Sequence, residues 1–271
     1  MKTILLFLLT ATLPLCGLNA ALLVYEGFNY TVPGTLTGQS GGTGFTAAWT
    51  GGGSGSTFNL SGTGLSSGSL QVTGGSILDN SGSTFSNARA YDVGGFQDNG
   101  DSLWFSTLVN IPTGSWTSPQ KVFFLSNALD DSGIGFQINA GGTLVGKISG
   151  TTSTGSATLA QNTTHLIVGR IDFTSASAQT ITYWVNPTLG STPLDGAANF
   201  TLSASVSSAN HRSGNIFVGS FSNTQGAFDE IRLGTSFSDV APIPEPGTYA
   251  LLGTGLALLA LLRGLKPATR S

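Results

Sequence analysis

Short segments of alternating apolar residues constrain the fold of this chain more than any other feature of its sequence. Between residues 133 and 139, isoleucine or phenylalanine occupies every second position, with glycine, glutamine and asparagine around them. Residues 179–185 repeat the pattern with Ile181, Tyr183 and Val185. Because successive side chains of a β-strand point to opposite faces of a sheet, this alternation is typical of strands. Between the two chain ends, no window of about 11 or more residues shows the period of an amphipathic helix.

Further segments of strand-like composition follow one another, separated by clusters of glycine, serine, asparagine and aspartate. They are residues 22–28, 69–73, 88–93, 102–111, 121–126, 143–149, 164–173, 215–221 and 226–233. About a dozen short strands without crossover helices favour an antiparallel architecture. The predicted fold class is all-β, an antiparallel β-sandwich of the jelly-roll kind.

Charged residues are scarce, and their balance excludes some partners. Asp, Glu, Lys and Arg make up 8% of the chain, about a third of the usual share. Residues 21–247 contain 6 basic and 13 acidic side chains, a net charge of −7. Without a basic patch, nucleic acid is not expected as a partner. The acidity also disfavours direct electrostatic binding to anionic lipid or acidic polysaccharide.

The first 20 residues have the organisation of a secretory signal peptide. Lys2 gives a positive start, residues 4–15 are apolar apart from two threonines, and Ala20 offers a small residue for cleavage. Cleavage after Ala20 is predicted, with cleavage after Ala21 as the alternative. The only cysteine, Cys16, suggests lipidation instead, but it follows a leucine and not a small residue. After cleavage the body has no thiol, which excludes disulfides, thiol catalysis and cysteine-bound metals.

The last 28 residues contain three distinct parts. Pro244, Glu245 and Pro246 form a rigid, non-helical segment, and residues 249–262 are an uncharged, mostly apolar run. Three basic residues follow: Arg263, Lys266 and Arg270. A 14-residue helix spans about 21 Å, which is marginal against a hydrocarbon core of about 30 Å. The basic residues would stop the chain in the cytoplasm, so the body is expected outside. A buried core helix is the alternative, but it would show a polar face.

A Pro-Glu-Pro segment, a short apolar run and a basic end in this order resemble the PEP-CTERM sorting signal of bacterial surface proteins. The resemblance implies an exosortase-type processing enzyme as a partner, removal of the tail, and a place at the cell surface or in an exopolysaccharide matrix. One feature departs from the family pattern, because the basic residues are spread out and Pro267 interrupts them. The expected layout is a signal peptide at 1–20, a body at 21–241, a linker at 242–247, a transmembrane helix at 248–263 and a cytoplasmic tail at 264–271.

Three short stretches of the body resemble concanavalin A-like and laminin-G-like sandwiches. They are Tyr-Glu-Gly-Phe at residues 25–28, Tyr-Trp-Val-Asn-Pro at 183–187, and residues 226–234. That family includes carbohydrate-binding modules and glycosidases. The resemblance implies that the first and last strands pair, so that residues 25–28 lie beside residues 228–233.

Carboxylates are the candidate catalytic groups, because a glycosidase needs two of them about 5–10 Å apart across the sugar. Strand pairing could bring Glu26, Asp229 and Glu230 together. The Glu-x-Asp-x-(x)-Glu spacing of retaining glycosidases of this fold is missing, however. The alternative is a surface ion pair plus one aspartate that fixes a turn or bulge. The two histidines, His165 and His211, are expected to be structural, so no catalytic residue is predicted.

Aromatic side chains are the candidate ligand contacts, because sugar rings stack on them. The four tryptophans are Trp49, in a glycine-rich region at 37–68, Trp104, Trp116 and Trp184. Core packing is the alternative for each of them. Asp98 and Asp101 could hold Ca²⁺ through oxygen ligands, but an ordinary turn before the strand at 102–111 is the preferred explanation; no other cofactor is expected.

The sequence thus predicts an exported, non-enzymatic surface or matrix protein with a structural or carbohydrate-binding role. Membrane association through the C-terminal run and contact with polysaccharide are the expected interactions. A glycoside hydrolase or polysaccharide lyase of the same fold is the alternative.

Overall fold

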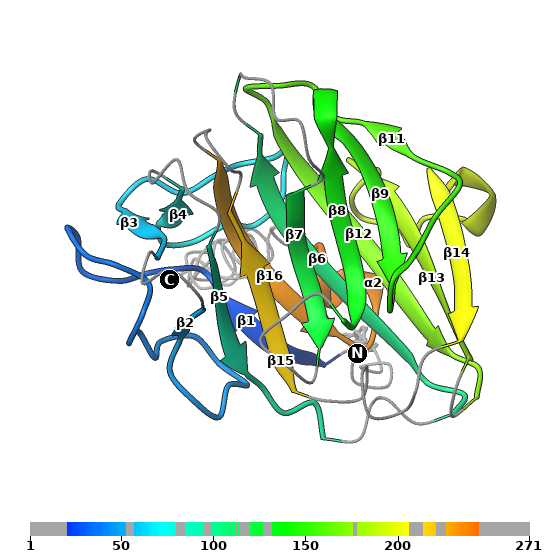
Figure 1. Ribbon diagram of the computed structural model, residues 1–271, viewed down its shortest axis with the longest axis horizontal. Coiled ribbons are helices and arrows are strands. Elements are labelled where there is room, and N and C mark those ends of the chain that lie inside the picture. Colours follow the sequence, from blue (N-terminus) through cyan, green and yellow to red (C-terminus); the bar gives the residue numbers. More distant parts are fainter. Residues whose placement is uncertain are drawn as a thin grey trace, which may run out of the picture.

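Two antiparallel sheets pack face to face and form the body (Figure 1). The computed structural model describes residues 21–52, 57–79, 85–94, 99–111, 113, 120–126, 132–175, 178–205, 214–220 and 226–243. Within these ranges the structure is almost entirely β, and the predicted antiparallel sandwich is confirmed.

The first sheet has eight strands. Their order is β14 (Phe200–Ser205), β13 (Ala178–Val185), β12 (Thr164–Phe173), β6 (Ser102–Asn110), β16 (Ala227–Gly234), β4 (Ser76–Leu78) and β3 (Asn59–Ser61), and β1 (Leu22–Glu26) also pairs with β16. Three short helical turns lie outside the sheets: η1 (Ala140–Gly142), η2 (Asp195–Ala197) and α2 (Phe237–Val240).

The second sheet also has eight strands. Their order is β10 (Thr151–Thr152), β9 (Thr143–Ile148), β8 (Ile134–Asn139), β7 (Gln120–Ser126), β15 (Asn215–Gly219), β5 (Ser86–Ala90) and β2 (Thr50–Gly52), and β11 (Ala157–Thr158) pairs with β9. Each sheet therefore combines strands from distant parts of the chain.

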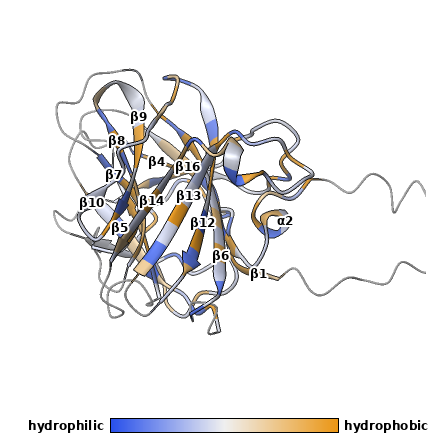
Figure 2. Ribbon diagram, turned by 90° about the vertical axis from the view of Figure 1, so that its right-hand side faces the viewer, coloured by the Kyte–Doolittle hydropathy of each residue, from blue (hydrophilic) through white to orange (hydrophobic). Residues whose placement is uncertain are grey.

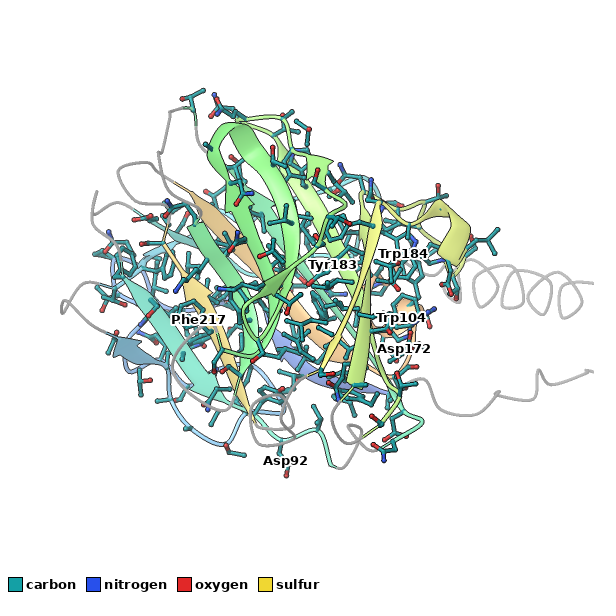
Figure 3. The ribbon with its side chains drawn as sticks, turned by 45° about the vertical axis from the view of Figure 1, so that its right-hand side comes forward. Asp92, Trp104, Asp172, Tyr183, Trp184 and Phe217 are labelled. Carbon is teal, nitrogen blue, oxygen red and sulfur yellow. The ribbon has the colours of Figure 1, made fainter. Side chains whose placement is uncertain are left out.

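Aromatic rings fill the space between the sheets. Phe105 of the first sheet stacks on Phe123 of the second with 5.3 Å between ring centroids, and Phe123 stacks in turn on Phe136. Gly169 leaves room for this packing, since a Cβ there would lie 2.2 Å from the Phe105 ring. Tyr183 points into the same core, where its hydroxyl donates to the Gly135 carbonyl (Figure 3). Each buried aromatic side chain contributes about 1.5–3 kcal/mol through removal from water.

The first and last strands pair, as the resemblance to laminin-G-like sandwiches implied. β1 runs antiparallel to β16, with Tyr25 opposite Arg232 and Glu26 opposite Ile231. Next to this pairing, the backbone N–H of Ala21 donates to the Thr235 hydroxyl at 3.1 Å. The start of β1 therefore lies beside the end of β16.

A second apolar cluster covers the outer face of the first sheet. Trp104 of β6 stacks on Trp184 of β13 with ring centroids 5.4 Å apart, and Phe237 of α2 packs edge-on against Trp104. Figure 2 shows α2 outside β6 and β12. The α2 segment is fixed by a capping box and by the Ser106 hydroxyl, which donates to the Val240 carbonyl at 2.5 Å. The C-terminal segment thus closes a small core of its own.

Residues 69–73 form no strand, which corrects the sequence prediction. Leu70 is buried in the second apolar cluster and Val72 packs against it, so their alternation reflects burial without strand pairing. The Gln71 N–H bonds to the Pro242 carbonyl and the Thr73 N–H to the Glu230 carboxylate. The segment is therefore held by hydrogen bonds to Pro242, to β1 and to β16, and not by a strand ladder.

No helix within the described ranges is long and apolar enough to cross a membrane. The predicted signal peptide at 1–20, the Pro-Glu-Pro segment, the transmembrane helix at 248–263 and the basic tail at 264–271 all lie outside those ranges.

Candidate functional site

A bulge in β16 determines where the candidate carboxylates point. The pairing of β16 with β6 shifts register between Asp229 and Arg232, and Glu230 has a positive φ of 53°. The regular alternation expected from the sequence is lost at this point. Asp229 and Glu230 both bond to the segment at residues 65–73 on the outer side of the sheet.

Glu26 lies on the other side of the sheet, between the two layers. Its neighbour in the ladder, Ile231, belongs to the main core. The carboxylate pairs at 2.7 Å with Arg89 of β5 in the opposite sheet, and both side chains are at most 3% exposed. Trp49 Nε1, at 3.0 Å, and the Tyr30 hydroxyl, at 2.6 Å, also donate to Glu26.

This buried network has the features of a structural cross-link. The N–H of Phe28 donates to the remaining Glu26 oxygen at 2.9 Å, so both oxygens are bonded. The network raises the pKa of Tyr30, mainly through burial and then through the hydrogen bond to Glu26. The Phe45 ring lies 3.8 Å from the Arg89 guanidinium and covers it. Complete hydrogen bonding is what allows an ion pair to be tolerated between two sheets.

Glu230 is also engaged in an ion pair. It pairs with Arg232 on the same strand, and it accepts hydrogen bonds from the Tyr25 hydroxyl at 3.0 Å and the Thr73 N–H at 2.7 Å. Arg232 lies over the Tyr25 ring and donates to the Gln71 carbonyl. Burial raises the pKa of Tyr25.

Asp229 fixes the bulge. This role was predicted from the sequence for one aspartate, as the alternative to a glycosidase site. One oxygen accepts the N–H of Glu230 at 2.7 Å and the other accepts the N–H of Leu65 at 2.8 Å. Burial raises the pKa of Asp229 to about 8, against the two backbone hydrogen bonds, which lower it. The three carboxylates therefore do not converge on one cleft, since Glu26 lies inside the sandwich and the other two lie outside it.

The remaining polar candidates have structural surroundings. His165 is buried, with Nε2 at 3.0 Å from the Ala160 carbonyl and Nδ1 at 3.0 Å from Asn186 Nδ2. Asp101 directly precedes β6, and its carbonyl accepts the Phe173 N–H. Asp98 and His211 lie outside the described residues. In the part of the chain that the structure describes, His, Cys, Asp and Glu form no group of three suited to a metal.

Three of the four tryptophans predicted to stack on a ligand lie in the described part of the chain, and all three are packed in the body. Trp49, Trp104 and Trp184 are 1%, 6% and 2% exposed, and Trp116 lies outside the described residues. Trp49 bonds to Glu26 and packs against Phe28, and Trp104 lies between Trp184 and Phe237. Neighbouring side chains cover both Trp49 and Trp104, so neither ring presents an exposed face in this structure. Trp184 contacts a surface hollow, and ligand stacking there stays a prediction.

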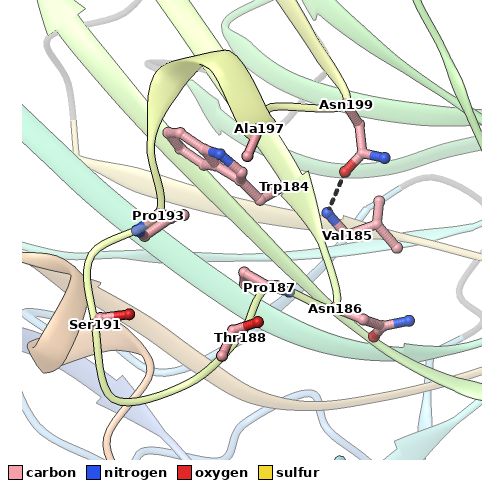
Figure 4. A pocket seen from close by; sticks show the side chains of 9 residues that line it. All are labelled: Trp184, Val185, Asn186, Pro187, Thr188, Ser191, Pro193, Ala197 and Asn199. Carbon is pink, nitrogen blue, oxygen red and sulfur yellow. Dashed lines mark hydrogen bonds between the residues drawn. The ribbon is translucent and has the colours of Figure 1, made fainter.

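That hollow lies in the connection between β13 and β14, and it is named here the 186–199 hollow. It encloses about 320 Å³ and is lined by Trp184, Val185, Asn186, Pro187, Thr188, Ser191, Pro193, Ala197 and Asn199 (Figure 4). None of these side chains is charged. In the sequence, this long connection shows only prolines and glycines, which are typical of turns. The hollow was therefore not predicted from the sequence.

The C-terminal residues match a known sorting signal. Residues 242–264 match the PEP-CTERM protein-sorting motif. No curated protein matches the chain.

Solved structures resemble this chain at low sequence identity. An endo-β-1,4-glucuronan lyase from the fungus Trichoderma reesei has a TM-score of 0.51 and 13% identity over 82% of this chain and 99% of its own. A carbohydrate esterase from the Shiga toxin-encoding bacteriophage phi24B has a TM-score of 0.49 and 12% identity over 80% and 100%. The botulinum neurotoxin type G receptor-binding domain has a TM-score of 0.44 and 10% identity over 78% and 47%. At such identities, the likeness to the lyase shows the fold alone. The protein is thus an all-β sandwich followed by a PEP-CTERM sorting signal, which marks it for export.

Proposed function

We propose that this protein is a non-enzymatic component of the bacterial cell surface or of its exopolysaccharide matrix. In this proposal an exosortase-type enzyme removes the tail after export. The observation that supports a non-enzymatic role is the placement of the three carboxylates. Glu26 and Glu230 form buried ion pairs, and Asp229 holds the bulge. Glycoside hydrolysis needs two carboxylates facing one bound sugar. Glu26 and Glu230, on opposite faces of one sheet, do not meet that requirement.

Processing and location can be tested in a host that contains the exosortase. The exported protein should begin at Ala21 or Leu22 and lack residues 251–271 by intact mass. Pro removes backbone donors and blocks helix formation, so the Pro-Glu-Pro segment should present an extended chain to the enzyme. The Pro244→Ala/Pro246→Ala double variant should therefore stay uncut and membrane-bound. Pro187→Ala, a proline change within the body, should be cut like the wild type.

The same purified protein tests the absence of enzymatic activity. Incubation with neutral and uronate-containing polysaccharides should release neither new reducing ends nor unsaturated uronates. Activity that Glu26→Gln or Glu230→Gln abolished, in a variant that still folds, would replace the proposal with a hydrolase or lyase. Wild-type protein that kept its full tail in the exosortase host would leave a plain C-terminal anchor instead.

A further inference from the structure

The 186–199 hollow has a lining of mixed but uncharged chemistry. Pro187, Pro193 and an edge of Trp184 supply apolar surface, while Asn186, Asn199, Thr188 and Ser191 supply amides and hydroxyls. Its volume of about 320 Å³ lies at the lower end of the range for small-molecule sites, about 300–1,000 Å³. The chain from Asn186 to Asn199 runs around the hollow, and the Ser191 hydroxyl points inward (Figure 4).

Several contacts hold this loop in one shape. Asp195 at its tip forms two hydrogen bonds with Arg170 of β12, at 2.8 and 3.1 Å. Trp184 Nε1 donates to the Leu194 carbonyl at 3.2 Å. At the loop ends, Asn199 Oδ1 accepts the Val185 N–H at 2.7 Å. A site that exists before the ligand arrives loses less entropy on binding, so these contacts favour a binding role.

Some polar groups of the lining already form hydrogen bonds within the protein, so only the others can bind a ligand. Asn186 is engaged by the Leu166 N–H and by His165, and the indole N–H is used within the loop. The Thr188 and Ser191 hydroxyls and the Asn199 amide nitrogen have no hydrogen bond within the described residues. Arg170, which bonds to the loop at Asp195, is paired with both Asp172 and Asp195. The hollow therefore offers hydroxyls, one amide and apolar surface, and no free charge.

A ligand that fits this lining has hydroxyl edges, an apolar face and no charge. A purely apolar ligand would bury the hydroxyls without partners, which is unfavourable. An anionic ligand would meet no cationic side chain in this lining, in a body of negative net charge. We propose that the 186–199 hollow binds a neutral saccharide, with Pro187 and Pro193 against the C–H face of one pyranose ring and Thr188 and Ser191 at its hydroxyls. This site rests on the proposed matrix role and supplies its ligand class.

The test is calorimetric titration of the exported, processed protein with neutral gluco-, manno- and galacto-tetrasaccharides, and with tetragalacturonate as the charged comparison. At least one neutral tetrasaccharide should bind, and tetragalacturonate should not. Thr188→Ala/Ser191→Ala should weaken binding at least tenfold, and Ala197→Trp, which fills the hollow, should abolish it. The matched control is Thr180→Ala/Ser203→Ala, which removes two hydroxyls that bond to each other on the exposed side of β13 and β14. It should bind like the wild type.

Three results would overturn the inference: no binding of any neutral tetrasaccharide, preferential binding of tetragalacturonate, or saccharide binding unaffected by both loop variants. Thermal unfolding of each variant should match the wild type, because all the altered residues of the hollow are exposed. If only the loop double variant unfolded early, Ala197→Trp would decide the question. Failure here leaves the export, processing and activity tests of the proposed function unaffected.

Discussion

At the scale of single residues, the Glu26–Arg89 pair ties the two sheets together through the core. Arg89→Met should leave the Glu26 carboxylate buried without its cation. Removing one partner of a buried pair costs about 3–5 kcal/mol in the free energy of unfolding. Asp195→Asn is the control, since that carboxylate is 65% exposed and such pairs contribute about 0–1 kcal/mol. Urea unfolding measures the free energy of unfolding of both variants. Equal losses would show that the buried Glu26–Arg89 pair contributes no more than an exposed pair.

Asp229 gives stability a definite dependence on pH. Its pKa is raised to about 8 in the folded protein from an ordinary 3.8, so the folded state keeps a proton that the unfolded chain releases. Its stabilising contribution is complete below about pH 4 and is lost as pH rises through about 8, by up to about 1.4 kcal/mol per pH unit. Asp229→Asn cannot release this proton. Its unfolding free energy should therefore fall less than the wild type's between pH 5 and 8, and parallel curves would contradict the assignment.

Sequence reasoning identified these carboxylates but could not place them. Pairing of the first and last strands followed from the resemblance, and it brings Glu26 opposite Ile231. The bulge depends on how β16 meets both β6 and the segment at 65–73, contacts that are distant in sequence. Which face of the first sheet becomes the inner one, and so whether a carboxylate lies inside or outside the sandwich, is fixed only when the second sheet packs on it.

At the scale of elements, α2 has only four residues and still closes an apolar cluster. Phe237→Ala should open a cavity beside Trp104 and lower the free energy of unfolding by about 3–5 kcal/mol. Ser238→Ala, at an exposed position on the same turn, should change it by less than about 0.5 kcal/mol. Chemical denaturation followed by tryptophan fluorescence would check this, because Trp104 reports on the cluster directly. A small change in the free energy of unfolding for Phe237→Ala would mean that α2 contributes little to the stability of the cluster.

Long strands were predictable because they alternate over five or more positions, as β8, β12 and β13 do. The three-residue strands β2, β3 and β4 were missed, since three residues are too few to show a period. β14 alternates as clearly as β13, with Phe200, Leu202 and Ala204 directed to the core, and it was also missed. The segment at 69–73 was predicted as a strand and is not one. Alternation indicates that one side of a segment is buried, but it does not show that the segment pairs with another strand.

At the scale of the whole molecule, the sorting signal begins where the body ends. The matched motif starts at residue 242, while the Pro242 carbonyl still accepts the Gln71 N–H. A chain that ends after Ile243 should therefore keep the full fold. One that ends after Thr235 loses Phe237, Val240 and Ala241 from the second cluster and should be less stable by about 5 kcal/mol. Thermal unfolding and binding of a hydrophobic dye would compare the two chains, and equal stability would contradict the sealing role of α2.

The pairing of β1 with β16 also imposes an order of events on export. A chain that crosses a membrane with its N-terminus first delivers β1 at once, yet the partner strand lies about two hundred residues later. The ladder between them cannot form until Ala227–Gly234 has emerged. The residues that match the sorting motif, 242–264, begin eight residues after this strand. Completion of the first sheet therefore has to wait until the strand just ahead of the sorting motif has left the membrane.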